Sequence, residues 1–417
     1  MILAVGIFVA ALAAIASDRV HRTKVALIGA ALVVLTQTID QERAIEAIDF
    51  NTIGLLAGMM LIVRVTEPTG VYNYLAIRAG QVARGRPLAL VLSLAGTTAL
   101  LSAFLDNLTT VVLIVPITFF LADALEIDPL PLVVIEIIAS NIGGTATLIG
   151  DPPNILIAGA TGLSFLDFVT NLAPVSALAF FAVTGALYVG YRPRLQIPPE
   201  AHERVMSLDA RRSIEDVDEL RRTVPVMVAT IVVFFVHKPL HLEPATVALT
   251  GAAVMLLVTR QTVETALEGI EWGTLFFFLG LFIMVGALEE NGAIARIAEG
   301  FAAATGGDAT VELLGIAWVA AIGSAVVDNI PFTATMIPVV EELHAGGDGD
   351  GHWWALALGA CFGGNATLVA AAANVAAAGM AERAGRPISF VGFLKVGVPA
   401  TLLSLAIATV YILLRYA

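Results

Sequence analysis

The sequence of 417 residues is poor in charge. Only 14% of its residues are charged and 58% are hydrophobic, whereas an ordinary soluble domain has about 25% charged residues. A soluble fold needs more polar surface than this, so the composition excludes a soluble enzyme and a disordered tail. The net charge of -13 argues against nucleic-acid binding, because phosphate backbones attract basic proteins. With a mean hydropathy of +0.89, the chain is predicted to lie in a lipid bilayer.

Ligands for metals and cofactors are scarce. The single cysteine, Cys361, excludes an intrachain disulfide and a cysteine metal cluster. The six histidines lie in or beside polar connections without a metal-binding spacing, so no metal and no cofactor is expected. No phosphate-binding Gly-x-x-x-x-Gly-Lys-Ser/Thr motif occurs, which excludes ATP hydrolysis by this chain but leaves a separate ATPase subunit open as a partner. We therefore expect a protein that is not an enzyme.

Apolar stretches long enough to cross a bilayer recur along the chain. They are residues 2–16, 24–38, 50–66, 132–158 and 170–190 in the first half, and 224–236, 245–258, 272–287, 354–380 and 391–414 in the second. Two further stretches, 88–121 and 309–342, are interrupted in the middle by Asp-Asn. No basic residue precedes the first stretch, which is therefore expected to be a retained helix rather than a signal peptide.

Lysine and arginine positions predict the orientation of these segments. If alternate connections face the cytoplasm, all but four of the 22 basic residues lie inside, the four outside being Arg43, Lys238, Arg296 and Arg415. This distribution predicts ten crossings of a plasma or inner membrane, with both termini outside. The connection 122–131 fits less well, because it would face inside with acidic residues and no basic one.

The second half of the chain repeats the first. One constant offset in numbering aligns Gly58 with Gly280, Asp106-Asn107 with Asp328-Asn329, and Pro116 with Pro338. A slightly shorter offset then aligns Gly143-Gly144 with Gly363-Gly364, Thr147 with Thr367, and Asn154 with Asn374. Chance does not readily match these residue types in one order at nearly one offset. The chain is therefore interpreted as a duplication.

Each half makes an odd number of crossings, so the two halves have opposite orientations in the membrane. The halves are residues 1–190 and 224–417, and a charged, proline-containing cytoplasmic linker, 191–223, joins them. The predicted fold is an all-α polytopic membrane protein of two inverted repeats, each with a re-entrant hairpin and a discontinuous helix. Such repeats are typical of secondary transporters, whose site lies at the repeat interface near the midplane.

Polar residues interrupt the apolar chain in four places. Two are the Asp-Asn tips of 88–121 and 309–342, whose arms are too short to span comfortably and therefore predict re-entrant hairpins. The other two are breaks in 132–158 and 354–380, where free carbonyls can hold a cation, and Asn or Thr side chains an anion. The candidate substrate- or ion-binding residues are Asp106, Asn107, Thr109, Thr110, Asn141, Gly143, Gly144, Thr145, Thr147, Asp151, Asn154, Asp328, Asn329, Thr333, Gly363, Gly364, Asn365, Thr367 and Asn374.

Structural roles compete with binding at some positions. A pair such as Gly143-Gly144 often marks close helix packing, but its symmetric recurrence favours a site. Asp106 and Asp328 can also cap the helix that follows each of them, which is compatible with ion binding. Glu136 lies in an apolar run and is interpreted either as a proton carrier or as a side chain that snorkels to the membrane edge.

The run from Glu136 to Asn154 contains Ser-Asn-Ile-Gly-Gly-Thr and Gly-Asp-Pro-Pro-Asn, and it resembles the signature of the ion transporter superfamily. The branch that looks nearest comprises arsenite permeases, the melanosomal P protein and NhaD-type sodium/proton antiporters. Dicarboxylate and citrate carriers are more distantly similar. The Asp-Asn-Leu-Thr-Thr run at 106–110 resembles the same branch, and the similarity covers essentially the whole chain.

This resemblance implies a homodimer in which each protomer has a scaffold domain and a transport domain that moves like an elevator. The hairpins and broken helices would form the transport domain. The resemblance assigns one half of the site to Asn107, Thr109, Asn141 and Thr145, and the other half to Asn329, Thr333, Asn365 and Thr367. Dicarboxylate carriers have Ser-Asn-Thr at both tips, whereas this chain has Asp-Asn-Leu-Thr and Asp-Asn-Ile-Pro. An arginine clamp for an anion is also missing from the expected core.

The function favoured by the sequence is proton-coupled efflux of a small inorganic species such as arsenite or antimonite. Arsenite is mostly an uncharged hydroxide at neutral pH, so Asn, Thr and backbone groups are adequate ligands. The main alternative is a sodium/proton antiporter in which Asp106, Asp151 or Asp328 exchanges cation for proton, so the coupling ion is H+ or Na+. A dicarboxylate or citrate carrier, a passive channel and an intramembrane aspartyl protease are further alternatives. The protease leaves the inverted repeat unexplained.

Overall fold

The computed structural model describes residues 1–17, 19–344 and 349–417, and within these ranges all regular structure is helical. The α-helices are α1 (Ile2–Ala16), α2 (Arg22–Leu35), α3 (Gln41–Glu46), α4 (Phe50–Thr66), α5 (Val71–Val82), α6 (Pro87–Ser102), α7 (Asn107–Ala124), α8 (Leu130–Gly144), α9 (Pro152–Thr161), α10 (Phe165–Tyr191), α11 (Pro199–Ser207), α12 (Val217–Val236), α13 (Pro244–Val258), α14 (Val263–Glu268), α15 (Trp272–Glu290), α16 (Ala293–Thr305), α17 (Ala309–Val326), α18 (Asn329–His344), α19 (Gly351–Gly363), α20 (Ala372–Arg383) and α21 (Phe390–Arg415). Short 3-10 turns lie at Glu67–Thr69, Arg192–Arg194 and Ala210–Ser213.

All twelve apolar stretches of the sequence are helical. The two stretches with Asp-Asn tips form the helix pairs α6/α7 and α17/α18, and the two glycine-containing stretches form the interrupted pairs α8/α9 and α19/α20. Six helical segments of the described chain are long and apolar enough to cross a membrane, and four shorter apolar helices accompany them. The short helices α5 and α16 were not expected, because their mixed composition hides them in sequence.

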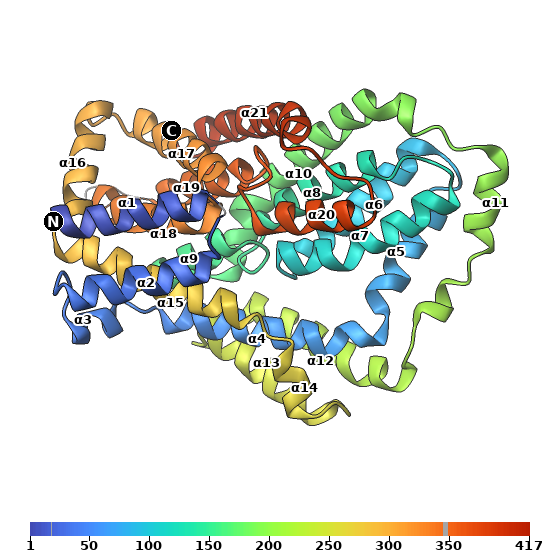
Figure 1. Ribbon diagram of the computed structural model, residues 1–417, viewed down its shortest axis with the longest axis horizontal. Helices are drawn as coiled ribbons and strands as arrows, with labels where there is room; N and C mark the ends of the chain where they lie inside the picture. The colour runs from blue at the N-terminus through green and yellow to red at the C-terminus, as the bar shows by residue number, and fades with distance from the viewer. Residues whose placement is uncertain (18, 345–348) are drawn as a thin grey trace.

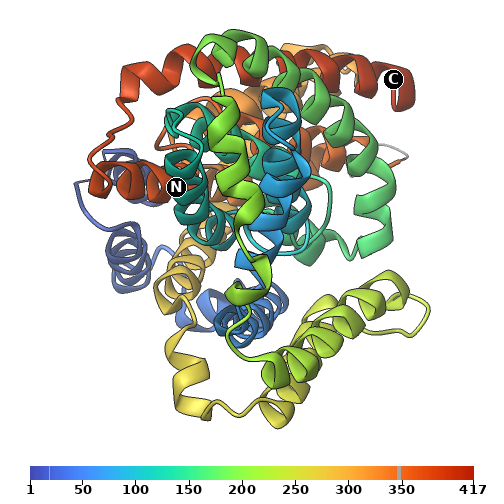
Figure 2. The same cartoon turned by 90° about the vertical axis from the view of Figure 1, so that its right-hand side faces the viewer.

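The inverted arrangement is visible in Figure 1. The hairpin α6/α7 lies in the half of the molecule next to the linker helix α11, and the hairpin α17/α18 lies in the other half, near the N-terminus. The linker crosses one end of the molecule from α10 to α12, and it faces the viewer in Figure 2. Both chain ends lie toward the opposite end (Figure 1). The two hairpins therefore enter from opposite ends, as the sequence predicted.

Matched contacts join the two repeats. Helix α2 packs on α15, and its counterpart α13 packs on α4, the counterpart of α15. A Cβ atom added to Gly58 would meet the backbone of Ala248, and one added to Gly280 would meet the backbone of Ala26. Gly280 follows Gly58, and Ala248 follows Ala26, at the same offset that relates the two repeats. The duplication is thus a structural pseudo-symmetry, and glycine is required where the helices approach most closely.

The helices form two groups. The scaffold consists of α1–α4 and α12–α15, and several of its helices run along the lower edge of Figure 1. The second group, which the resemblance leads us to call the transport domain, consists of α5–α10 and α16–α21. The two groups meet where α4 contacts α9 and where α15 contacts α18. This division places the hairpins and the broken helices together in one domain.

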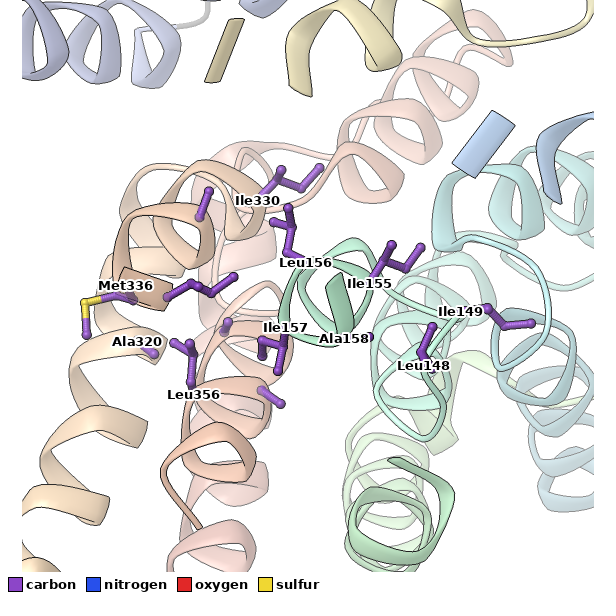
Figure 3. Close-up of a cluster of buried hydrophobic side chains, with 14 of the residues drawn as sticks. Leu148, Ile149, Ile155, Leu156, Ile157, Ala158, Ala320, Ile330, Met336 and Leu356 are labelled. Carbon is purple, nitrogen blue, oxygen red and sulfur yellow. The ribbon is translucent and has the colours of Figure 1, made fainter. Parts of the chain in front are cut away.

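Each broken helix reaches across to the hairpin of the other repeat. Helix α9 packs on α18 and α19, and α20 packs on α7 and α8. In Figure 3, Leu156 and Ile157 of α9 lie on the side facing Ile330 and Leu356, whereas Ile155 lies on the opposite side of α9, on which Leu148 and Ile149 also lie. All of these side chains are buried. The apolar surface of α9 is therefore buried against α18 and α19 of the other repeat, and this burial favours their packing as one unit.

The acidic connection 122–131 has basic partners. Glu126 Oε1 lies 2.5 Å from Arg204 Nη2 in the linker, and Asp128 Oδ1 lies 3.9 Å from Arg386 Nη1. The sequence assigned both arginines to the cytoplasmic side. The ion pairs therefore place this connection on the same side of the molecule as the basic segments, which accounts for a loop without basic residues of its own.

Candidate functional site

The aspartates at both hairpin tips cap the helices that follow them. Asp106 accepts hydrogen bonds from Thr109 N at 2.8 Å and from Thr109 Oγ1 at 2.5 Å. Asp328 Oδ1 accepts one from Ile330 N at 2.9 Å. The capping interpretation is confirmed, because these carboxylates satisfy backbone donors that the helix leaves unpaired. Capping also fixes the adjacent asparagines, Asn107 and Asn329, in the interior.

Two asparagines close the breaks in the discontinuous helices. Asn154 Nδ2 donates to the carbonyl oxygens of Thr145 at 3.0 Å and Thr147 at 2.7 Å. Asn374 Nδ2 donates to those of Gly364 at 2.7 Å and Thr367 at 2.8 Å. The sequence suggested that such carbonyls could hold a cation. In this structure the paired asparagines occupy these four carbonyls, which removes the cost of unpaired polar groups.

A chain of side-chain amides connects the repeats at the centre. Asn107 Nδ2 donates to Asn141 Oδ1 at 3.3 Å, and Asn141 Nδ2 donates to Asn365 Oδ1 at 2.9 Å and Asn374 Oδ1 at 3.0 Å. Ser102 Oγ donates to Asn107 Oδ1. These asparagine side chains are buried, so the network is costly to disrupt. It brings together four of the predicted site residues from both halves of the sequence.

A cavity of about 40 Å³ lies between the hairpin tips and the scaffold. Carboxylate residues Asp106, Asp151 and Glu271 line it, together with Asn107 and Asn329. Asp151 is fully buried, and its Oδ1 accepts a hydrogen bond from Asn329 Nδ2 at 3.1 Å. Its Oδ2 has no hydrogen-bond partner among the described residues. The volume suits a small ion or a water molecule, whereas pockets for larger ligands measure roughly 300 Å³ or more.

Sequence reasoning missed two charged scaffold residues that line this cavity, Arg22 and Glu271. Arg22 Nη1 lies 3.3 Å from Asp328 Oδ2, and its guanidinium stacks 5.3 Å from the ring centre of Phe277. The sequence did not indicate an arginine at this cavity, but Arg22 is paired with Asp328 and is not a free clamp for an anion. Arg22 was assigned to a cytoplasmic connection because it belongs to a cluster of basic residues. Its counterpart is Pro244, so the repeat carried no signal for it.

Several predicted site residues do not line the cavity. The hydroxyl groups of Thr145 and Thr333 donate to carbonyls one turn earlier in their own helices, at 2.7 Å and 2.6 Å. Thr147 and Thr367 donate to the backbone of the hairpin arms, at Ala103 and Ala325. These threonines therefore hold the site together from outside the cavity. Thr110 Oγ1 is buried and has no partner among the described residues.

The predicted glycines divide between packing and the site. A Cβ atom on Gly143 would meet the backbone of Ala99, and one on Gly363 would meet the backbone of Ala321. Both glycines thus allow close packing of a broken helix on a hairpin arm. A Cβ atom on Gly144 would instead meet the side chain of Asn107, so this glycine leaves room for a site amide.

Glu136 lies away from the cavity, within α8. Its side chain is buried, and its Oε1 accepts a hydrogen bond from Thr118 Oγ1 of α7 at 2.6 Å. Its Oε2 has no partner among the described residues. Because the side chain points into the transport domain, the snorkelling alternative is wrong. The proton-carrier role stays a prediction.

Comparison with known sequences supports a transporter. The profile described as "Citrate transporter" matches residues 12–359. An uncharacterized transporter of Mycobacterium bovis is 45% identical to the chain, with an alignment that covers 100% of this chain and 98% of that protein. The P protein of Sus scrofa is 32% identical over 95% of this chain, which spans 57% of the P protein.

The fold is also found in a solved structure. The YdaH transporter of Alcanivorax borkumensis, described as having an unusual topology, superposes with a TM-score of 0.61. The superposition covers 91% of this chain and 88% of that one at 18% sequence identity. At this identity the similarity concerns the fold alone.

Proposed function

The chain belongs to the citrate transporter family of membrane transporters, and from this premise we propose that it is a secondary active cation/proton antiporter with sodium as the transported cation. The proposal rests on one observation. Three carboxylate residues, Asp106, Asp151 and Glu271, line a single small cavity at the hairpin tips. Oxygen ligands with negative charge suit a hard cation or a proton.

The same cavity bears on the other candidate substrates. Arsenite export, which the sequence favoured, requires only neutral ligands. An uncharged substrate would leave the three carboxylates of the cavity with Arg22 as their only positive partner among the described residues of its lining. Citrate carries several negative charges and is larger than about 40 Å³ allows. One arginine, already paired with Asp328, is a weak anion site. Arsenite or antimonite efflux is therefore the second proposal, and citrate transport the third.

The division into two domains supports alternating access. The cavity lies at the contact between the scaffold, which supplies Arg22 and Glu271, and the transport domain, which supplies both tips. We propose that the transport domain slides as an elevator along the scaffold of a homodimer in the cell membrane. Glu136 is proposed to carry protons within the moving domain, and no ATPase subunit is needed for a gradient-driven cycle.

Transport in proteoliposomes that contain a pH-sensitive dye tests the function. Sodium, arsenite and citrate are added in turn, with an Asn107→Ala/Asn329→Ala double variant as the inactive control. We expect a proton signal on sodium addition that the double variant lacks. Proton-driven arsenite movement without a sodium response would replace the antiporter by the arsenite exporter. Flux that ignores an opposing gradient would indicate a channel.

A further inference from the structure

The scaffold carries two equivalent carboxylates at its opposite ends. Glu271 directly precedes α15 and lines the site cavity, and Asp49, its counterpart in the first repeat, directly precedes α4. Thr274 Oγ1 donates a hydrogen bond to Glu271 Oε2 at 3.0 Å. Thr52 Oγ1 donates in the same way to Asp49 Oδ2. The scaffold thus builds one acid–threonine pair twice, and the hydrogen bond limits the orientations of each carboxylate.

The site cavity lies at the Glu271 end of the scaffold. Its scaffold residues include Arg22 and Thr274, at the starts of α2 and α15, and Met60 in the second half of α4. It shares Met60 and Glu271 with an adjoining cavity of about 170 Å³. A path of cavities therefore leads from the hairpin tips to this end of the molecule.

A much larger cavity, of about 760 Å³, lies at the Asp49 end. The starts of α4 and α13 and the end of α15 form its scaffold side, and α9 and α18 form its other side. Its acidic lining residues are Glu46, Asp49, Glu289 and Glu341, and no lysine or arginine of the described chain lines it. It has no described residue in common with the site cavity. This end is therefore attractive to cations but separated from the site in this conformation.

The hairpin tips are displaced toward the Glu271 end. The 170 Å³ cavity is lined by α7 residues beginning at Thr109, only three residues after the tip aspartate. The 760 Å³ cavity is lined by α18 residues beginning at Ala334, six residues after its tip aspartate. Part of the difference in volume between the two cavities has a local cause. The long side chain of Arg64 packs against Gly269 at the Glu271 end, whereas the equivalent contact at the Asp49 end joins the small residues Gly286 and Ala47. The cavity at the Glu271 end begins closer to its hairpin tip than the cavity at the Asp49 end does. This second difference arises because the tips lie nearer the Glu271 end.

On the premise of the proposed function, we propose that Glu271 and Asp49 are alternating scaffold ligands for the transported cation. Asp151, fully buried with Oδ2 free of partners among the described residues, moves with the tips and holds the cation throughout. Glu271 completes the site in the present conformation, beside Asp106. After the transport domain moves, the pseudo-symmetry brings Asp49 to the equivalent place beside Asp328. In each of the two end states, the bound cation then neutralises the negative charge of two facing carboxylates.

Sodium-driven proton exchange measured separately in right-side-out and inside-out vesicles tests the proposal, because each preparation exposes one face to added sodium. We expect Glu271→Gln to raise the half-saturating sodium concentration by at least about tenfold at one face and to change it little at the other. Asp49→Asn is expected to do the reverse. The acidic replacements Glu271→Asp and Asp49→Glu keep the charge and are expected to retain most of the affinity, which separates a lost ligand from a folding defect.

Glu46→Gln is the matched control, because Glu46 lines the same cavity as Asp49. Because Glu46 adds only to the general negative charge of this cavity, the replacement is expected to change the half-saturating sodium concentration by about twofold or less at either face. Equal effects of Glu271→Gln and Asp49→Asn at both faces, or no effect at either, would overturn the alternating ligands while wild-type exchange still supported the antiporter. Absence of exchange by the wild-type protein at both faces would overturn the antiporter and the cation ligands together.

Discussion

The side-chain amide of Asn141 donates a hydrogen bond to Asn374 Oδ1 at 3.0 Å and so joins the broken helix of one repeat to that of the other. The counterpart of this pair is Cys361 and Asn154, whose Sγ and Oδ1 atoms are 3.7 Å apart. A thiol is a weak donor compared with an amide. The centre of the protein is therefore symmetric in its backbone and asymmetric in its chemistry.

Removing the amide at this position should cost both stability and transport. Asn141→Ala leaves buried groups of Asn107, Asn365 and Asn374 without this partner, and each unsatisfied group costs about 1–3 kcal/mol. We expect the free energy of unfolding to fall by about 3 kcal/mol or more and exchange to be lost. Denaturant unfolding in detergent and the dye assay measure the two effects. Cys361→Ala, the matched control, should cost about 1 kcal/mol or less, and an equal loss in both variants would contradict the asymmetry.

The Arg22–Asp328 ion pair should weaken sodium binding in the wild-type protein. Arg22→Gln removes a positive charge from the wall of the site cavity and frees the carboxylate of Asp328. We expect the half-saturating sodium concentration to fall by about fivefold, corresponding to about 1 kcal/mol. Sodium titration of the proton signal measures it. Arg22→Lys keeps the charge and should resemble the wild type, whereas weaker sodium binding by Arg22→Gln would show that the arginine supports the site.

Glu136→Gln separates proton movement from cargo binding. The replacement keeps the shape of the side chain but removes the group that can release a proton, and Glu136 lies outside the cavity. We expect the proton signal to disappear while sodium still raises the melting temperature of the purified protein. Thr118→Val, which removes only the hydrogen bond to Glu136, should leave a measurable signal. A normal proton signal in Glu136→Gln would contradict the proton-carrier role and indicate that the residue is structural.

Close packing of the two repeats should depend on glycine at position 58. A side chain in Gly58→Val collides with the backbone of Ala248, which cannot move away without separating α4 from α13. We expect a loss of about 3 kcal/mol or more, seen as a lower melting temperature and aggregation during size-exclusion chromatography. Gly185→Ala is the control, because a Cβ atom there meets no neighbour and alanine favours a helix by about 1 kcal/mol. Similar melting temperatures and elution profiles for the two variants would contradict the requirement for glycine at position 58.

Much of the fold was predictable because its signals are local. The length of each apolar stretch predicts a helix, and the Asp-Asn tips mark the hairpin turns through helix capping. The recurrence of Gly58 as Gly280, at the same offset as the Asp-Asn tips, predicts the second repeat. The helices α5 and α16 escaped prediction because a short amphipathic helix gains its stability from tertiary packing rather than from composition.

The sequence by itself determined that the chain lies in a bilayer and that Asp106 and Asp328 stand at the tips, because apolar length and capping act over a few residues. It also determined that the halves are inverted, because the same residue types recur in the same order in both halves and each half makes an odd number of crossings. Only the tertiary structure decided what surrounds those tips. Arg22 reaches Asp328 across 306 residues of sequence, and Glu271 enters the cavity from a helix start. A threonine hydroxyl can bond either to its own helix or to a cavity, and packing alone makes that choice at Thr145 and Thr333.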